Sequence, residues 1–447
     1  MIEVRVWKSG RAAVKETFEV AIVGAGPAGI SAAYVLAGAG KKVIVLERGE
    51  HPGSKNVSGG VLYGHDLAQI IPDYIEKGCP VERNIVESRI WYLSKDSGFN
   101  LSYRDPVFGT ERQHNAFTIS RAKFDRWYAD QARRKGALIV PSTVVTDLLR
   151  DDKRAVTGVV TQREDGEVRA KVTLLADGIN SPLAARTGFR PEPKPEQVAL
   201  AVKEVISLPT ETINERFGVS EREGVTTEIL GEVTGGMDGV AFIYTNHSSV
   251  SLGIGANLAD FAAFKLKPYD LIEGLKQHPM VAPLISGGKP MEYTAHWLAE
   301  GGFDAVPKLY GDGYLIAGDS AMLFNTLHRE GNNLAMASGK MAADAILKAF
   351  KLNDFSQTGL KGYGDRLTKS FIMKDLRKYR RLGGFLYRHK EIFSQLPQLA
   401  SFGAREIITV NGVSKKDKEK SILRKIRKDM PIPRIFRLIW QAWRATR

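Results

Sequence analysis

A glycine-rich turn near the start of the chain constrains the fold more than any other feature. Residues 18–23 (FEVAIV) predict a buried strand, and the sequence GAGPAG then places Gly24, Gly26 and Gly29 at the G-x-G-x-x-G positions. An apolar helix of small residues follows, and residues 41–49 (KKVIVLERG) predict a second strand. This order is a strand–helix–strand unit of the nucleotide-binding type.

Each residue of the turn has a physical role at a phosphate group. Gly24 permits the tight turn out of the strand, Gly26 lets the backbone approach a pyrophosphate, and Gly29 lets the helix sit close to the sheet. Pro27 and Ala28 complete a helix start whose free N–H groups and partial positive charge attract phosphates. We therefore expect these five residues to contact a dinucleotide.

An acid follows at the position that such a unit requires. Glu47 ends the second strand, where a carboxylate can accept hydrogen bonds from the two hydroxyl groups of a ribose. A structural glycine turn is the alternative interpretation, and the strand, helix and acid in this order argue against it. The unit alone does not distinguish FAD from NAD.

Two later turns favour FAD. Asp177 and Gly178 follow a predicted strand in LLADGINS, and Gly318 and Asp319 follow another in GYLIAGDSAM. An aspartate at the second turn can bind a hydroxyl group of the ribityl chain. Each turn taken singly is also compatible with an ordinary connection between elements.

A third segment predicts the contact with the flavin ring. Gly331, Asn332 and Asn333 open a strong predicted helix. A helix N-terminus directed at the pyrimidine end of a flavin would stabilise the negative charge of its reduced form.

The remaining pattern predicts an α/β fold in which a Rossmann-like FAD-binding domain contains an inserted β-rich domain and a helical, basic C-terminus follows. We place the first part of the FAD-binding domain at 1–200, the β-rich substrate domain at 201–308, the second part of the FAD-binding domain at 309–350, and the C-terminal region at 351–447. The first sixteen residues resemble an edge strand, although their role cannot be read from the sequence.

Charge and cysteine content narrow the class of protein. The net charge is +14, and the last 33 residues hold twelve Lys or Arg against three acids. Such a tail predicts an anionic partner, and without a recognisable nucleic-acid-binding fold we do not expect it to be a nucleic acid. One cysteine, Cys79, cannot form a disulfide or an iron–sulfur cluster within the chain, and no metal site is expected. No apolar run is long enough to span a membrane.

The end of the chain predicts an amphipathic helix. Its apolar stripe consists of Ile432, Ile435, Phe436, Ile439, Trp440 and Trp443, and its polar side of Arg434, Arg437, Gln441 and Arg444. Tryptophans beside arginines are typical of a helix that lies in a membrane interface. A helix docked on this chain or on a partner has the same periodicity, so both interpretations stay open. Residues 415–421 (KKDKEKS) indicate a solvated linker before it.

The order of these motifs resembles a known family. GAGPAG…LERG, SRAKFDRW, ADGINS and LIAGDSAM resemble the flavoproteins that include geranylgeranyl reductases and aromatic hydroxylases. Two blocks, KNVSGGVLYGHDL (55–67) and residues 278–309, resemble the FixC branch of the electron transfer flavoprotein–quinone oxidoreductases. The resemblance covers residues 18–350.

The resemblance implies further cofactor contacts. Arg48 matches the adenosine end, and Gly59 and Gly60 match the segment near the isoalloxazine ring. Arg121, in the pattern SR-x-x-FD, is expected near the pyrophosphate or the ribityl chain. The backbone of Val145 is expected to meet the adenine.

The resemblance also implies a quinone pocket in the β-rich domain. Gly239 and Val240 would offer backbone hydrogen bonds to a quinone carbonyl, with Phe242 and Tyr244 beside them; a buried strand is the alternative. The family tends to have glycine where this chain has Val240. His247 and His328 are candidate proton donors, although solvated or core histidines are the commoner case.

The function implied is transfer of electrons from an electron transfer flavoprotein to membrane menaquinone or ubiquinone. Relatives work within a four-subunit, FixABCX-type complex that bifurcates electrons, and the iron–sulfur cluster would belong to a small ferredoxin-like partner. A peripheral position on the cytoplasmic face of the membrane follows from this assignment. We assign no catalytic side chain. An isoprenoid double-bond reductase and a subunit that only relays electrons remain alternatives.

Overall fold

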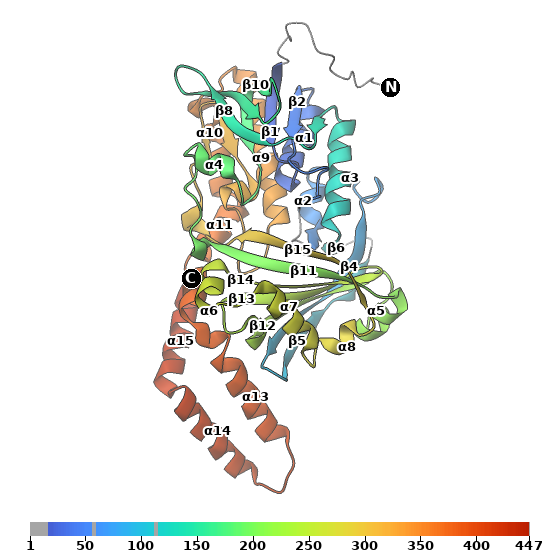
Figure 1. Cartoon of the computed structure of the whole chain (residues 1–447), viewed down its shortest axis with the longest axis vertical. Helices are drawn as coiled ribbons and strands as arrows, with labels where there is room; N and C mark the ends of the chain where they lie inside the picture. Colours follow the sequence, from blue (N-terminus) through green and yellow to red (C-terminus); the bar gives the residue numbers. More distant parts are fainter. Residues whose placement is uncertain (1–16, 56–59, 111–114, 447) are drawn as a thin grey trace.

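The computed structural model of the chain describes residues 17–55, 60–110 and 115–446. Figure 1 shows one sheet and its helices in the upper half, a second sheet across the middle, and the C-terminal helices at the lower left. The predicted edge strand within residues 1–16 lies outside the described residues.

The first sheet is mainly parallel, as the strand–helix–strand pattern predicts. Its strands, in spatial order, are β16 (Tyr310–Gly311), β17 (Tyr314–Ile316), β10 (Glu167–Leu175), β1 (Thr17–Val23), β2 (Val43–Leu46) and β7 (Leu138–Val140). In addition, β9 (Val156–Thr161) pairs antiparallel with β10, and β8 (Val145–Arg150) pairs antiparallel with β9. The central strands β1 and β2 are nearly continuous apolar runs, because residues on both faces of the sheet are buried.

Small residues let the helices of this domain pack closely. α1 (Pro27–Gly38) packs against a long helix, α9 (Asn332–Leu352), and a Cβ atom at Gly339 would lie only 2.1 Å from the Ala28 carbonyl oxygen. Two more helices complete this layer: α3 (Arg121–Arg134) and α10 (Gln357–Lys369). Segments from the two ends of the sequence therefore form one domain.

The second sheet is mainly antiparallel. Its strands, in spatial order, are β15 (Lys289–Ala299), β11 (Val198–Ser207), β14 (Ser249–Asn257), β13 (Gly239–Thr245), β12 (Glu223–Gly231), β4 (Val81–Leu93), β6 (Ala116–Ile119) and β3 (Val61–Tyr63), with β5 (Gly98–Arg104) beside β4. Figure 1 also shows short helices on or beside the two sheets: α2 (Gly64–Ala68), α4 (Pro182–Arg186), α5 (Thr210–Phe217), α6 (Leu258–Phe264), α7 (Pro268–Gln277) and α8 (Ala282–Ile285).

The predicted fold class is confirmed, with one difference in how the second sheet is composed. β3, β4, β5 and β6 come from residues 61–119, which the sequence pattern places in the first part of the FAD-binding domain. The boundary at residue 200 therefore does not separate the two sheets. The link is the parallel pairing of β4 with β12, which joins segments far apart in the sequence and leaves no local signal.

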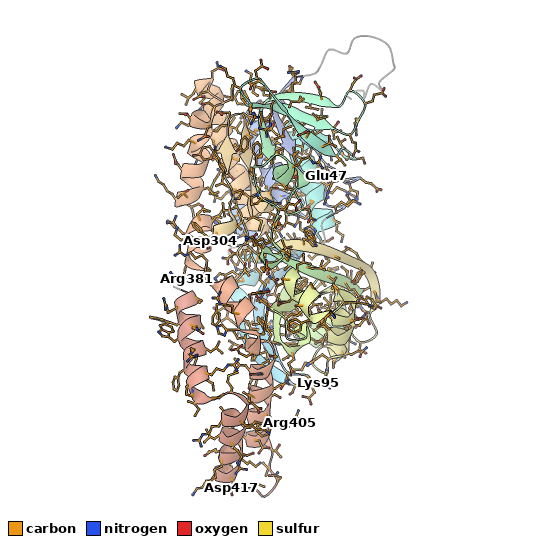
Figure 2. All side chains as sticks on the ribbon, turned by 60° about the vertical axis from the view of Figure 1, so that its left-hand side comes forward. Glu47, Lys95, Asp304, Arg381, Arg405 and Asp417 are labelled. Atoms are coloured by element: carbon orange, nitrogen blue, oxygen red, sulfur yellow. The ribbon has the colours of Figure 1, made fainter. Side chains whose placement is uncertain are left out.

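Five helices form the C-terminal region: α11 (Phe371–Lys378), α12 (Leu382–Arg388), α13 (Gln395–Ile408), α14 (Lys415–Asp429) and α15 (Ile432–Ala445). α13 and α14 form a hairpin that projects from the body, and Figure 2 shows Arg405 and Asp417 along it. Arg405 pairs with Asp96 at 3.0 Å, and the Tyr92 hydroxyl donates to the Ile392 carbonyl. These contacts attach α13 and the segment before it to β4 and to the β4–β5 turn.

The prediction of a solvated linker at 415–421 is wrong, because these residues form the first half of α14. Ser414 caps the helix by accepting a hydrogen bond from the Asp417 N–H at 3.2 Å. The Ile422 side chain lies against α13 at Gly403, 3.8 Å from where a Cβ atom would be. A cap and one apolar stripe outweigh the charges. Most of these charges face solvent, and the buried Lys418 donates its Nζ to the Thr409 carbonyl.

Candidate functional site

A cavity of about 870 Å³ lies between the two sheets. Its volume is near the upper end of the range for ligand pockets, about 300–1,000 Å³. The predicted site residues that line it are Gly24, Gly26, Pro27, Ala28, Glu47, Arg48, Gly60, Arg121, Val145, Asp177, Gly178, Gly239, Val240, Phe242, Tyr244, Asp319, Gly331 and Asn332. Residues predicted for the cofactor and for the substrate thus meet in one space.

Three other predicted residues that the structure describes do not line the cavity. Gly29 packs α1 onto the turn, since a Cβ atom there would lie 2.0 Å from the Gly24 carbonyl oxygen. Gly318 has a φ of +64° and supports the turn before Asp319, and Asn333 is buried behind the start of α9. Gly59 lies outside the described residues.

The phosphate end of the site is a backbone cradle. Gly24 has a φ of +99°, and a Cβ atom there would lie 2.4 Å from the Ala176 carbonyl oxygen. Gly26 is different, because no described heavy atom lies within 4 Å of its Cβ position. It precedes the first residue of α1, where backbone N–H groups face the cavity. This open space fits the pyrophosphate of a dinucleotide.

Glu47 is held in place at the ribose end. One carboxylate oxygen accepts the Ala25 N–H at 2.9 Å and the other accepts the Gly49 N–H at 2.7 Å. Each oxygen keeps a further lone pair, so the group can still accept hydrogen bonds from ribose hydroxyls. Val145 is buried at the start of β8 and Arg48 is exposed at the cavity edge.

Arg121 is the centre of a buried clamp. Its guanidinium makes two hydrogen bonds of 2.9 Å to the Asp125 carboxylate and donates to the Asn332 side-chain oxygen at 2.7 Å. The Asn332 amide donates to the Val61 carbonyl at 2.9 Å. Burial would lower the pKa of Arg121, but the Asp125 carboxylate raises it overall. The clamp joins α3 to the first turn of α9.

The sequence prediction omitted Asp125. Its carboxylate is nearly inaccessible and takes both arms of the Arg121 fork. The available signal was the i, i+4 spacing of the two residues on a predicted helix.

The two predicted aspartate turns lie side by side. The Ser320 hydroxyl donates to the Asp177 carboxylate at 3.0 Å and accepts the Gly178 N–H at 2.8 Å. Burial raises the pKa of Asp319 to about 6, against the opposing effect of nearby Arg121 and Arg190. Ser320 and Arg190 were not predicted, although Ser320 stands directly beside Asp319 in the motif. No described residue forms an ion pair or a hydrogen bond with the Asp319 carboxyl group, which lines the cavity and is therefore available to a ligand hydroxyl.

The two predicted ligand regions touch at Gly60. A Cβ atom at Gly60 would lie 2.9 Å from Cδ2 of Tyr244, whose ring stacks on Phe242 with centroids 4.5 Å apart. Gly60 is the residue expected near the flavin ring, and Tyr244 is expected beside the quinone. The geometry therefore allows both predicted ligands to lie within one aromatic environment.

The backbone at Gly239 and Val240 is only partly used by the sheet. β13 pairs with β14 through both residues, but its pairing with β12 ends at Ala241. On the β12 side, the backbone groups of these two residues are outside the ladder. These groups are therefore available for hydrogen bonds to a ligand carbonyl or hydroxyl.

Two carboxyl groups that the sequence prediction omitted face this end of the cavity. Burial, followed by the charge of Asp238, raises the pKa of Glu300 to about 7. Burial also raises the pKa of Asp238 to about 6, although Lys390 opposes this effect. Both groups therefore hold protons more strongly than ordinary carboxyls, which is a property of proton donors near neutral pH.

The two histidines predicted as candidate proton donors differ in their position relative to the cavity. His328 lines the cavity and its Nε2 lies 3.3 Å from the Tyr379 hydroxyl, whereas His247 is exposed beside Glu221 and does not line it. His296 also lines the cavity, and burial lowers its pKa to about 4, so it is neutral at physiological pH. Of the two candidate donors, only His328 is in a position to reach a ligand.

The cavity ends in an apolar region formed by the C-terminal helices. Leu382, Leu386, Ile392 and Phe393 line it there. α12, which carries two of them, packs against α15. An apolar ligand could therefore extend from the aromatic region toward the C-terminal helices.

α15 leaves most of its predicted apolar stripe uncovered. Leu438 and Ala445 are buried toward the body, while Phe436 is 69% exposed and Trp440 is 52% exposed. Ile439 and Trp443 are exposed as well. Among the described residues, no helix is both long enough and apolar enough to cross a bilayer.

Two protein-family models match the chain. The FAD dependent oxidoreductase model matches residues 19–185, which hold the phosphate cradle, Glu47 and Arg121. The ETF-QO/FixC family C-terminal domain model matches residues 382–447, which begin at α12 and include the apolar end of the cavity.

Solved structures share the fold. A geranylgeranyl bacteriochlorophyll reductase-like protein from Thermoplasma acidophilum aligns with a TM-score of 0.70 and 20% identity, over 93% of this chain and 97% of that one. The flavin-dependent brominase Bmp2 aligns with a TM-score of 0.63 and 17% identity, over 92% and 100%. At these identities the likeness concerns the fold alone.

Curated relatives named Protein FixC extend over almost the whole length. The protein from Bradyrhizobium diazoefficiens is 45% identical over 92% of this chain and 94% of its own length. The protein from Azotobacter vinelandii is 44% identical over 96% of this chain and 99% of its own length. The protein from Escherichia coli K12 is 39% identical over 92% of this chain and 95% of its own length. With the two family models, this similarity shows that the chain belongs to the ETF-QO/FixC family of FAD-dependent oxidoreductases.

Proposed function

We propose that this protein accepts electrons from an electron transfer flavoprotein and reduces a membrane quinone, menaquinone or ubiquinone, at the second-sheet end of the cavity. The observation that carries the proposal is the continuity of the cavity from the cradle at Gly24 to the apolar end at Phe393. Bound FAD would supply the one- and two-electron chemistry. We assign to it the predicted cofactor residues, with Asp125 as the partner that orients Arg121.

The chain's own contribution to quinone reduction would be position and protons. A quinone that takes up two electrons and two protons becomes a quinol. The backbone at Gly239 and Val240 would hold one carbonyl, and Phe242 and Tyr244 would flank the ring. Glu300 and Asp238 would deliver protons, since both carboxyl groups face this region and keep their protons to unusually high pH.

The partners that we propose are an electron transfer flavoprotein of two subunits and a small ferredoxin-like protein, in a FixABCX-type bifurcating complex. This chain has one cysteine, and burial raises the pKa of Cys79 to about 12, so its thiol is unreactive. A cluster in the assembly would therefore belong to the small partner.

The proposed location is the cytoplasmic face of the membrane, as a peripheral protein. α15 supports this assignment because its aromatic stripe is exposed although the helix packs on α12 through its other side. A quinone resides in the bilayer, and α12 connects this helix to the apolar end of the cavity.

The test is direct electron transfer. The purified protein is reduced with its electron transfer flavoprotein, and reduction of menaquinone and of ubiquinone is followed. Transfer to at least one of them is expected. A flavin that is reduced by the partner but passes no electrons to either quinone would contradict the proposal.

An isoprenoid double-bond reductase is the second candidate. The cavity's apolar end would also accept an isoprenoid chain, and the motifs that carry the FAD site are common to both families. A saturated lipid product, formed from an unsaturated isoprenoid and a reductant, would favour this candidate. A chain that exchanges electrons only when its partners are present would favour a third role, electron relay within the complex.

A further inference from the structure

A second pocket, of about 390 Å³, lies between α12 and α15. Four arginines line it: Arg380, Arg381, Arg388 and Arg444. Its apolar wall includes the buried Phe385. This pocket is separate from the large cavity and none of the predicted site residues lines it.

Arg381 is the N-cap residue of α12, and its helical backbone conformation places it on the same face as Arg388. Residues at helical spacing line the pocket, at positions i, i+3, i+4 and i+7: Arg381, Gly384, Phe385 and Arg388. Gly384 contributes to its shape, since a Cβ atom there would lie 3.2 Å from Nη1 of Arg388. Figure 2 shows Arg381 on the outer side of the body, beside the C-terminal helices.

The charge of the pocket is uncompensated within the described part of the chain. None of its four arginines forms an ion pair with a described acid. Glu391 is engaged elsewhere, with His389 at 3.2 Å and Arg434 at 3.4 Å. Neighbouring guanidinium groups repel one another, and each offers a planar fork of donors that matches the oxygens of a phosphate. An anion with several oxygens would both neutralise this repulsion and accept hydrogen bonds from the guanidinium groups.

We propose that this pocket binds the phosphate headgroup of an anionic phospholipid. The inference deepens the proposed function, since it depends on contact between α15 and a membrane. A lipid is favoured over a soluble phosphate because Trp440 both lines the pocket and belongs to the exposed apolar stripe with Phe436 and Ile439. Acyl chains could lie along that stripe while the headgroup occupies the arginines.

α12 would connect this lipid to the redox site. Leu382 and Leu386 line the large cavity, whereas Arg381 and Arg388 line the small pocket. A headgroup bound on one side of this two-turn helix therefore holds the apolar end of the cavity against the bilayer on the other side. The pocket would fix where a quinone enters.

The test compares two charge-matched double variants of the full chain. R381Q/R388Q removes two pocket charges, and R424Q/R427Q removes two charges from exposed positions of α14. Sedimentation with vesicles of phosphatidylglycerol and phosphatidylcholine measures the affinity. We expect the pocket variant to bind about 30-fold more weakly, from about fivefold per arginine at an anionic leaflet, and the α14 variant to lose less than about threefold. Equal losses, or no loss in the pocket variant, would overturn the proposal.

Two further experiments identify the ligand of the arginine pocket. The lysine variant R381K/R388K keeps the charge but not the fork, so it should regain only part of the affinity; full recovery would contradict a phosphate-shaped site. Soluble glycerol phosphate should not displace the protein from vesicles at concentrations comparable with the lipid. If it does, the ligand is a free phosphate. If the pocket variant keeps its vesicle affinity and instead loses an acidic protein partner, the lipid assignment fails.

Failure of the lipid site and failure of the proposed function are distinguishable. Reduction of a short-chain, water-soluble quinone does not require a membrane and should be unchanged in R381Q/R388Q. Loss of vesicle binding with normal reduction of this quinone supports the pocket. Wild-type protein that binds vesicles but reduces no quinone leaves the pocket supported and refutes the quinone assignment.

Discussion

The two ends of the large cavity differ in how tightly they are packed and in how their charges are paired. At the dinucleotide end, Cβ atoms at Gly24 and Gly29 would lie 2.4 and 2.0 Å from carbonyl oxygens, and the buried charge of Arg121 is matched by Asp125. The opposite end, where we propose that the quinone binds, is called the acceptor end. Its wall is aromatic and aliphatic, and burial raises the pKa of Glu300 to about 7. A close-packed, charge-paired end suits a ligand that stays, and an apolar end with a proton donor suits one that is exchanged.

One added methyl group at Gly29 or at Gly26 should have the strongest effects at the dinucleotide end of the cavity. G29A forces a Cβ atom into the Gly24 carbonyl and should lower the free energy of unfolding by more than about 3 kcal/mol. G26A meets no described atom and should fold normally but lose its flavin, because the methyl group occupies the space for the pyrophosphate. Thermal unfolding and the visible spectrum measure the two effects.

The control for the glycine variants is G362A, on α10, where a Cβ atom also meets no described heavy atom. It should keep both stability and flavin. A G26A protein that retains a full complement of flavin would show that the turn is structural and does not bind phosphate.

The second largest effect concerns the charge pairing at the dinucleotide end. D125N leaves the Arg121 guanidinium buried without its counter-charge and should cost roughly 3 kcal/mol of stability, with loss of flavin. K123Q, on the same helix, breaks only the exposed pair of Lys123 with Glu82 and should cost less than about 0.5 kcal/mol. Urea unfolding of both variants measures the difference, and similar values would refute the clamp.

At the acceptor end the largest expected effect is on proton delivery. E300Q removes the proton donor that we propose and should slow quinone reduction by about tenfold to a hundredfold while leaving flavin content unchanged. D304N, which removes an exposed acid outside both pocket linings, is the control. The measurement is the steady-state rate of reduction of a soluble quinone. Equal rates for E300Q and wild type would exclude Glu300 as the proton donor.

The rate of quinone reduction should depend on pH through the protonation of Glu300. The pKa of Glu300 is raised from its ordinary value of 4.5 to about 7, so the carboxyl donates when pH is below 7 and loses its proton above it. The wild-type rate should therefore fall as pH rises through about 7, and E300Q should lack this fall. In stability the same group favours the folded state below pH 4.5, and this advantage is lost between pH 4.5 and 7.

The smallest effect is expected at Val240. V240G restores the second glycine that the family tends to have and allows a closer approach of the backbone to the quinone. We expect the KM for a soluble quinone to fall by roughly twofold to fivefold with kcat nearly unchanged. A rise in KM would instead assign the Val240 side chain to quinone packing.

The two ends also differ in how far the sequence predicts them. Gly24, Glu47 and Asp319 could be placed because their roles depend on local geometry, in which a strand leads into a turn and a helix. Asp125 was within reach through its spacing from Arg121. Ser320 stands in a recognised motif, but its bonds to Asp177 and Gly178 join distant segments.

The acceptor end depends on tertiary contacts that leave no local pattern. Glu300 and Leu386 are far apart in the sequence and meet only because the C-terminal helices close one end of the cavity. The pairing of β4 with β12 is equally nonlocal. The α14 segment was mistaken for a linker because its charges dominate the composition, whereas a cap at Ser414 and contact with α13 determine its structure.

We propose that one cavity holds a flavin and a quinone close enough for electrons to pass between them. The decisive experiment is anaerobic reduction of the purified protein by its electron transfer flavoprotein, followed by addition of menaquinone or ubiquinone. We expect a yellow protein with one FAD per chain, whose absorbance is bleached by the partner and restored by the quinone. A colourless protein, or a bleached one that only oxygen restores, would contradict this proposal.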